Sequence, residues 1–200
     1  MTDELTTAFL RVLDPTDNST GGGSASAIAG GMAAALVAMV ARLSMNGAGG
    51  APDDYYLPIA QAGADLMHAL IAGADEDAQS FDAVMAGYRL PKTTDAEKAA
   101  RTAAIRAAMA HATRVPLRNA ELCTEVLALV SRLEGRANPR ALSDLQSAGY
   151  LARAGLLGCL ANVDINLPGV KDEAAAAEIR TRAAALRPQA KENHAQDPAV

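Results

Sequence analysis

Three consecutive glycines, Gly21, Gly22 and Gly23, lead through Ser24 into an alanine-rich helical pattern. Glycine lets the backbone approach a ligand where a Cβ atom would clash. The first N–H groups of a helix lack partners within the helix and carry partial positive charge. The run is therefore typical of a cradle for an anion or another ligand. The same residues also suit a flexible loop that ends at Ser24 as a helix cap, and both interpretations stay open.

A second group of chemically capable residues is a set of carboxylates, Asp75, Glu76, Asp77 and Asp82, crowded into one helical pattern. Asp75 and Asp82 are seven residues apart, so they share one face of the helix about two turns from each other. Such carboxylates either bind a polar ligand or form a solvated acidic face. The pattern alone leaves both open.

Asp144 stands in a different setting. It follows a break at Asn138 and Pro139 and then Ser143, so we expect it in the first turn of a helix whose other residues are strongly apolar. An isolated carboxylate in such a segment is a candidate functional group. The N-terminus of a helix also favours aspartate by about 0.3 to 1 kcal/mol without any further role, and this alternative stays open.

Metal binding and nucleophilic catalysis find no support in the residue spacing. His68, His111 and His194 are scattered, and neither a paired-histidine motif nor a cysteine cluster is present. Cys123 and Cys159 lie inside helical patterns without motif spacing, which is typical of free buried thiols in a reducing compartment. No metal site is predicted.

The composition favours a single helical domain. The 200 residues are 50% hydrophobic, only 3% aromatic and free of tryptophan, so Ala, Leu, Val, Ile and Met must fill the core. The net charge of −5 lacks the basic footprint that nucleic acid binding needs. Acidic residues near the N-terminus argue against a secretory signal. The apolar run 25–41 reads as a core helix and not a membrane span, so we expect a cytoplasmic protein without a membrane or nucleic acid partner.

These residues must be positioned by helices, because every long segment has helical periodicity and none alternates as a strand would. We predict an all-α fold, a single-domain bundle of about six helices with long central ones. Thr94 and Glu97 form a capping box, and Pro116 lies inside the helix that follows. The domain is expected to cover 1–187, with a frayed tail at 188–200. The predicted helices cover 4–13, 24–45, 55–88, 94–133, 143–162 and 171–186.

Six blocks of sequence, in this order, resemble the cyclodeaminase/cyclohydrolase family of folate enzymes. This family includes stand-alone methenyltetrahydrofolate cyclohydrolases and the C-terminal domain of formiminotransferase-cyclodeaminase. The similarity runs from about Phe9 to Glu178. The blocks are GGGSA at 21–25, DAQSFDAVM at 77–85, LPKTTDAEKAAR at 90–101, ATRVPL at 112–117, NPRALSD at 138–144 and ANVDINL at 161–167.

The resemblance implies an all-helical, usually dimeric protein that binds a tetrahydrofolate derivative beside the glycine run and needs no metal or redox cofactor. It makes Asp144 the catalytic candidate, as a base or as a stabiliser of the substrate's cation. Asp77 and Asp82 would contact the pterin or support the fold. The substrate-binding candidates are Gly21, Gly22, Gly23, Ser24, Asp77, Asp82, Asn138 and Ser143.

Three functional hypotheses follow from the resemblance. The first is a cyclohydrolase that converts 5,10-methenyltetrahydrofolate to 10-formyltetrahydrofolate, and the absence of a formiminotransferase-like segment in this sequence favours it. The second is a cyclodeaminase that releases ammonia from formiminotetrahydrofolate. The third is a folate-like ligand-binding or assembly protein without catalysis. Residues 46–55 replace a lysine-rich stretch common in the family, which predicts weak affinity for polyglutamate tails or a different ligand.

Overall fold

A computed structural model describes residues 12–13 and 20–190 of the chain, and these residues contain no strand. The expected all-α class is confirmed. Of the predicted first helix at 4–13, only Val12 and Leu13 are described, and both are helical. The long helices are α2 (Gly22–Leu43), α3 (Asp53–Arg89), α4 (Asp95–Leu133), α5 (Leu142–Asn166) and α6 (Glu173–Leu186); the short 3-10 helices are η1 (Pro139–Ala141), η2 (Leu167–Gly169) and η3 (Arg187–Ala190).

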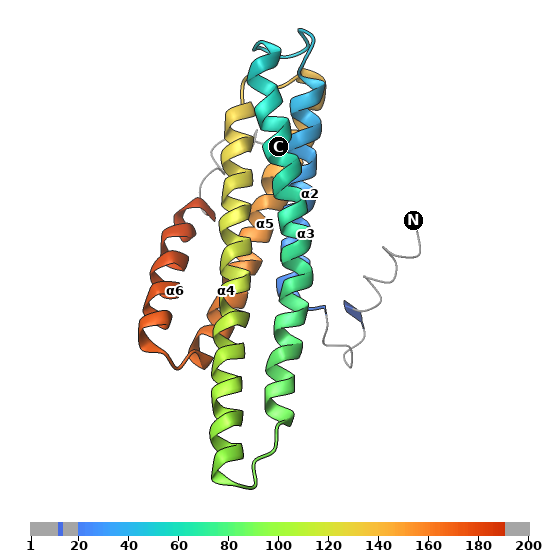
Figure 1. Ribbon diagram of the computed structural model, residues 1–200. Coiled ribbons are helices and arrows are strands. Elements are labelled where there is room, and N and C mark those ends of the chain that lie inside the picture. Colours follow the sequence, from blue (N-terminus) through green and yellow to red (C-terminus); the bar gives the residue numbers. More distant parts are fainter. Residues whose placement is uncertain (1–11, 14–19, 191–200) are drawn as a thin grey trace.

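Helices α2, α3, α4 and α5 run lengthwise beside one another (Figure 1). The shorter α6 lies along α4 on the side away from α2, and the α3–α4 hairpin extends beyond the other helices at one end (Figure 1). Helix α2 packs against α3, α4 and α5, so it is the central helix that the sequence predicts. The part of the bundle in which these four helices pack together therefore has about the length of α2.

Small residues let these helices approach closely. A Cβ atom at Gly63 of α3 would lie 3.0 Å from the Ala34 carbonyl oxygen of α2, and one at Gly155 of α5 would lie 2.8 Å from the Ser26 carbonyl oxygen of α2. Because neither position can hold a larger residue, α2 is held between α3 and α5 at nearly backbone-to-backbone distance. The core is accordingly built of Ala, Val, Leu and Ile, with Tyr56 as its largest buried side chain.

Helix α2 is long and apolar enough to cross a membrane by length and composition, and 56% of its most hydrophobic window is buried inside the molecule. Its contacts with three neighbouring helices identify it as the core helix expected from the run 25–41. Part of its apolar surface remains exposed.

The boundary of α2 differs from the prediction. The helix begins at Gly22 with Gly21 as its N-cap, and the Ala25 N–H donates to the Gly21 carbonyl at 3.0 Å. Ser24 is therefore not a cap but lies inside the first turn, where its side chain is free to contact another helix. At the other end of the chain, 188–190 continue as η3 with Ala190 buried, while 191–200 lie outside the described residues.

The start of α4 has the capping box that the sequence predicts. The Glu97 N–H donates to the Thr94 hydroxyl at 3.2 Å, and the Thr94 N–H donates to the Glu97 carboxylate at 2.8 Å. Thr94→Ala is expected to lower the free energy of unfolding by about 1 kcal/mol, measured by urea denaturation. Thr102→Ala, an exposed change two turns later, is the control; an equal loss in both variants would contradict a specific capping role.

Candidate active site

The glycine run and Ser24 meet two other helices at the start of α2. Gly21 and Gly22 are exposed with open space where a Cβ would lie, whereas Gly23 is buried. A Cβ at Gly23 would lie 2.5 Å from Oδ2 of Asp77 on α3 and 2.6 Å from Nδ2 of Asn162 on α5. Only glycine lets the two polar side chains come this close to the α2 backbone. Three helices therefore converge on one polar cluster, which we call the glycine-turn site: Gly21, Gly22, Gly23, Ser24, Asp77 and Asn162.

Asp77 is the carboxylate of this site. The Ser24 hydroxyl lies 3.0 Å from Asp77 Oδ2 and 3.1 Å from the Ala74 carbonyl oxygen. Burial raises the pKa of the Asp77 carboxyl above its ordinary value, and hydrogen bonds from the Ser24 side chain and backbone N–H act in the opposite direction. When Asp77 is ionised, Ser24 can donate to it; when Asp77 is protonated, it can donate to Ser24 while Ser24 donates to Ala74. The pair can therefore hold a proton or release it.

The position of Asp77 corrects the expectation of an open anion cradle. The Ser24 backbone N–H, one of the groups left over at the start of α2, is directed toward Asp77 and lowers the pKa of its carboxyl against the effect of burial. The protein's own carboxylate thus occupies part of the positive end of the helix. A carboxylate placed there favours a cationic or hydrogen-bond-donating ligand over a second anion.

Asn162 completes the cluster from α5. Asn166, one turn later, donates from Nδ2 to the Asn162 Oδ1 at 3.2 Å and to the Ala112 carbonyl oxygen at 2.9 Å. This orients Asn162 so that its Nδ2 faces Gly23 and Asp77. Neither asparagine was among the residues selected from the sequence. Their spacing of four in an apolar helix, inside the block 161–167, is the signal that could have found them.

Two buried cysteines, Cys123 of α4 and Cys159 of α5, lie next to each other in the core near Asp77. Cys123 and Cys159 are free and buried, as predicted. Hydrogen bonding with Cys123, together with burial, raises the pKa of the Cys159 thiol well above its ordinary value. The Cys159 sulfur therefore stays protonated and unreactive at neutral pH.

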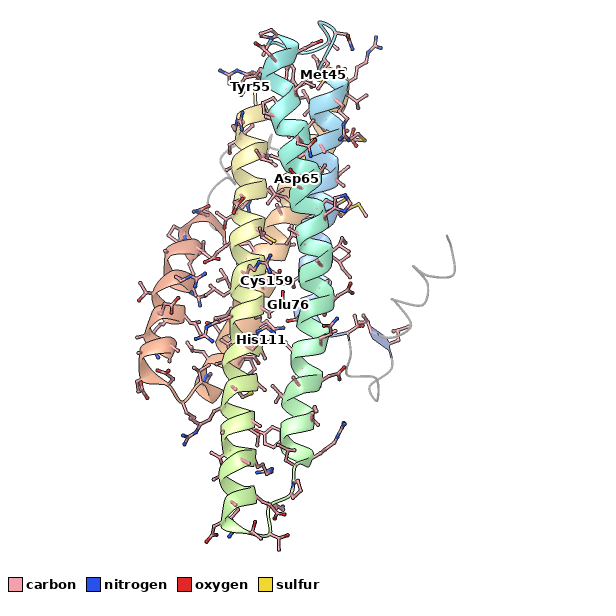
Figure 2. All side chains as sticks on the ribbon, viewed as in Figure 1. Met45, Tyr55, Asp65, Glu76, His111 and Cys159 are labelled. Atoms are coloured by element: carbon pink, nitrogen blue, oxygen red, sulfur yellow. The ribbon has the colours of Figure 1, made fainter. Side chains whose placement is uncertain are left out.

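Charged residues of α3 and α4 pair across these two helices, one position before Asp77 on α3. The Glu76 carboxylate lies 3.3 Å from Nη1 of Arg118 and 3.8 Å from Nε2 of His111. Figure 2 shows Glu76, His111 and Cys159 around the middle of the molecule, away from Met45 and Tyr55 at one end. Two hollows of about 490 and 360 Å³ lie elsewhere, between α3 and α4 and beside α5, and no residue of the glycine-turn site lines them.

The remaining candidates do not join this site within one chain. Asp82 is exposed on α3, and five residues beyond Asp77 it points about 140° away around the helix. Asn138 donates from Nδ2 to the Leu43 carbonyl oxygen at 2.9 Å, and its backbone N–H donates to Ser44 Oγ, so it ties η1 to the far end of α2. Ser143 is exposed near the same end.

The position of Asp144 differs most from what the sequence analysis leads one to expect. It is half-buried in the first turn of α5, as predicted. However, 18 residues of continuous helix separate it from Asn162, which places the two about 27 Å apart along α5. Within one chain, Asp144 therefore does not face the glycine run, beside which the resemblance places the folate. Asp144, Gly155, Gly158 and Asn162 nevertheless lie on one stripe of α5, the stripe that faces α2.

Comparison with known proteins identifies a family to which the sequence is similar. Residues 6–185 match the protein family described as formiminotransferase-cyclodeaminase. The chain belongs to this family. The resemblance drawn from the six sequence blocks is thereby confirmed.

Two relatives show how far the similarity extends. Methenyltetrahydrofolate cyclohydrolase from Methylorubrum extorquens is 38% identical over 177 residues, which cover 88% of this chain and 85% of that protein. Formimidoyltransferase-cyclodeaminase from Rattus norvegicus is 30% identical over 191 residues, which cover 92% of this chain but only 34% of the rat protein. The chain thus spans about a third of this second relative.

A solved structure supports the fold. Formiminotetrahydrofolate cyclodeaminase from Thermotoga maritima matches with a TM-score of 0.76 at 22% sequence identity, covering 90% of this chain and 85% of that one. The all-helical architecture is therefore shared with the family.

Proposed function

We propose that this protein hydrolyses 5,10-methenyltetrahydrofolate to 10-formyltetrahydrofolate. The observation that carries the proposal is the 38% identity to a methenyltetrahydrofolate cyclohydrolase, which extends over 85% of that relative's length. The geometry of the glycine-turn site agrees with it, because the site offers a carboxylate and an amide to a cationic ligand.

The chemistry requires a negative group beside a positive carbon. The methenyl bridge is an amidinium-like cation, and water adds to its carbon with loss of one proton. The second proton of the water then moves to the ring nitrogen as the bond between this nitrogen and the carbon breaks and the formyl group forms. We assign to Asp77 the stabilisation of this cation, with Ser24 able to exchange a proton with it. Asn162 Nδ2 is placed to donate to an oxygen of the adduct. These steps need neither a metal ion nor a redox cofactor.

The exposed glycines leave room for a ligand to come close to the backbone. Gly21 and Gly22 leave open space at the mouth of the site, so a planar pterin or a formyl oxygen can reach backbone N–H groups there. The binding role of these glycines is part of the proposal. So are the homodimeric state and the cytoplasmic location, the latter in keeping with two buried free thiols.

A second candidate reaction is release of ammonia from formiminotetrahydrofolate. It is favoured by the family match and by the rat relative, whose name includes a cyclodeaminase. The same carboxylate could stabilise a cationic amidine in either reaction, so the two are distinguished by substrate and not by site.

One assay tests the proposed function. Purified protein is expected to accelerate the loss of methenyltetrahydrofolate absorbance in proportion to its concentration, with 10-formyltetrahydrofolate as the product. A rate of absorbance loss equal to that in buffer alone would exclude cyclohydrolase activity. In that case, ammonia production from formiminotetrahydrofolate would support the second candidate reaction. Folate binding without turnover of either substrate would indicate a ligand-binding protein without catalysis.

A further inference from the structure

The hollow of about 360 Å³ beside α5 is lined by charged and polar side chains that the proposed reaction does not use. It lies where α4, α5 and η3 meet, and we call it the η3 hollow. Its polar lining is Ser131 and Glu134 of α4, Arg153 of α5 and Gln189 of η3. Pockets for small molecules have volumes of about 300 to 1,000 Å³ and combine apolar walls with a few polar groups. The η3 hollow therefore has the size and the lining of a site for a small metabolite.

Helical spacing and small side chains produce this hollow. Residues 131 and 134 share one face of α4, and residues 149 and 153 share one face of α5. The two faces meet at Gly149, where an added Cβ atom would lie 3.7 Å from Val130 Cγ1. Because Gly149 has no side chain and the serine at 131 has a short one, the two helices leave space between them. Helix η3 packs against α5 and borders this space.

Arg153 is the feature of the hollow that points to a ligand. It is half-buried, and its Nε atom is buried without a hydrogen-bond partner in the described part of the chain. A charged donor that is removed from water and left unpaired raises the free energy of the folded protein, and an acceptor on a ligand would recover this cost. The Nε and Nη donors of a guanidinium form a planar fork that matches the two oxygens of a carboxylate. Arg153 therefore offers an unused site for a carboxylate group.

Two arginines near η3 show what Arg153 lacks. Arg182 and Arg187 each form an ion pair with a carboxylate of this chain. Arg101 also has a buried Nε without a hydrogen bond, but its guanidinium stacks over the ring of Tyr88 at 5.5 Å. None of these three arginines lines the η3 hollow. Arg153 thus combines an unpaired Nε with a space that a ligand can enter.

Glu134 gives the same hollow a negative group. Its carboxylate is exposed, and no ion pair within the described ranges joins it to Arg153 or to another cation. Helices α4 and α5 run antiparallel (Figure 1), and Gly149 lies beside Val130, so Arg153 and Glu134 start from opposite sides of this contact along the bundle. The two opposite charges therefore face one space without neutralising each other.

This pair of charges determines the class of ligand. A phosphate or a dicarboxylate would bring excess negative charge next to Glu134, and a diamine would leave Arg153 unpaired. A molecule with one carboxylate and an ammonium group satisfies both residues, while the Ser131 hydroxyl and the Gln189 amide can donate to it or accept from it. We propose that the η3 hollow binds a free amino acid, with its carboxylate on Arg153 and an ammonium group on Glu134.

Isothermal titration calorimetry of the full chain with L-lysine tests the proposal. Lysine is the most suitable probe because it carries ammonium groups at two distances from its carboxylate. One molecule is expected to bind per chain, with a Kd of about 1 mM or lower. Hexanoate, which lacks both amines, and cadaverine, which lacks the carboxylate, are each expected to bind at least about 10-fold more weakly. The absence of saturable lysine binding, or equally tight binding of either analogue, would overturn the proposal.

Variants of the two charged residues locate the bound molecule. Arg153→Gln is expected to weaken lysine binding by about 10- to 100-fold, because the hydrogen bonds to the carboxylate lose their charge. Glu134→Gln is expected to weaken lysine binding but not hexanoate binding. The controls are Arg140→Gln and Glu125→Gln, exposed changes of the same charge outside the η3 hollow. Equal losses in the controls would show that lysine responds only to net charge, which would contradict the site.

Thermal unfolding separates a binding role of Arg153 from a structural one. Arg153→Met keeps much of the side-chain volume and removes the unpaired donors, so its Tm without ligand is expected to equal or exceed that of the wild type. Lysine at about ten times its Kd is expected to raise the wild-type Tm by about 3 °C and to leave that of Arg153→Met unchanged. A clearly lower Tm of Arg153→Met without ligand, or an equal response of both proteins to lysine, would overturn the proposal.

The η3 hollow and the proposed reaction can fail independently, because the hollow shares no residue with the glycine-turn site. Protein that binds lysine but does not hydrolyse methenyltetrahydrofolate would support the amino acid site and exclude only the reaction. Protein with full turnover and no lysine binding would have the opposite meaning.

Discussion

Replacing Gly23 with alanine is expected to lower the rate of methenyltetrahydrofolate hydrolysis by about 100-fold, because a displacement of about 1 Å at a reacting group can cost that much. The added Cβ would lie within 2.6 Å of both Asp77 carboxylate oxygens and of Asn162 Nδ2. One of these side chains must move. Both are short, so a move takes the carboxylate away from Ser24 or the amide away from the cluster. Steady-state kinetics on the purified variant measure the effect.

The cost in stability should be smaller than the cost in rate. Overpacking of this kind destabilises by about 1 to 3 kcal/mol, and relief by side-chain movement puts Gly23→Ala near the lower end. Gly149→Ala on α5 is the matched control, because a Cβ there meets only Val130 Cγ1 at an ordinary 3.7 Å. This control is expected to keep the wild-type rate and to gain about 0.5 to 1 kcal/mol of stability. Equal rates in the two variants would exclude the glycine-turn site from catalysis.

Asp77→Asn is expected to lower the rate by a factor of about 10² to 10⁴, the usual effect of removing a carboxylate that stabilises charge or moves a proton. The asparagine Oδ1 can still accept the hydrogen bond from Ser24, so the site keeps its shape and loses only its charge. Asp65→Asn, an exposed change on the same helix, is the control and is expected to keep the wild-type rate. Wild-type turnover by Asp77→Asn would assign the chemistry to other groups.

The same substitution has a stability effect of opposite sign. Burial raises the pKa of Asp77 in the folded protein above the ordinary value of 3.8, so the folded state binds this proton more tightly than the unfolded state does. This stabilisation is fully present below pH 3.8 and is lost as the pH rises through the raised pKa. The stability of Asp77→Asn relative to wild type should therefore increase with pH above that point and reach a plateau. Thermal unfolding of both proteins from pH 3.5 to 8 measures this; a difference that is flat or decreases with pH would contradict the buried, ionisable carboxylate.

A loss of rate together with an unchanged or higher stability would identify Asp77 as a functional residue. A purely structural carboxylate, replaced by its amide, would not produce a large change in rate. The combination is typical of active sites, where a charged group is held at some expense to the fold.

Some of the site followed from the sequence. Gly23, Ser24 and Asp77 were all candidates, and the structure joins them through a hydrogen bond and a close backbone approach. Asn162 and Asn166 were missed because the helical pattern around them is that of an ordinary amphipathic helix. Their significance comes from Gly23 and Ala112, which lie far away in the chain.

The sequence by itself determined the helices, the start of α4 and the family, because periodicity, capping and motif order are local properties that short stretches of chain carry. It could not determine which helix ends meet. Asp144 and the glycine run each begin a helix, but α2 and α5 pack antiparallel, so those two beginnings lie at opposite ends of the bundle. Only tertiary packing sets this direction, since it depends on close contacts between residues such as Gly30 and Gly155 that are more than a hundred positions apart.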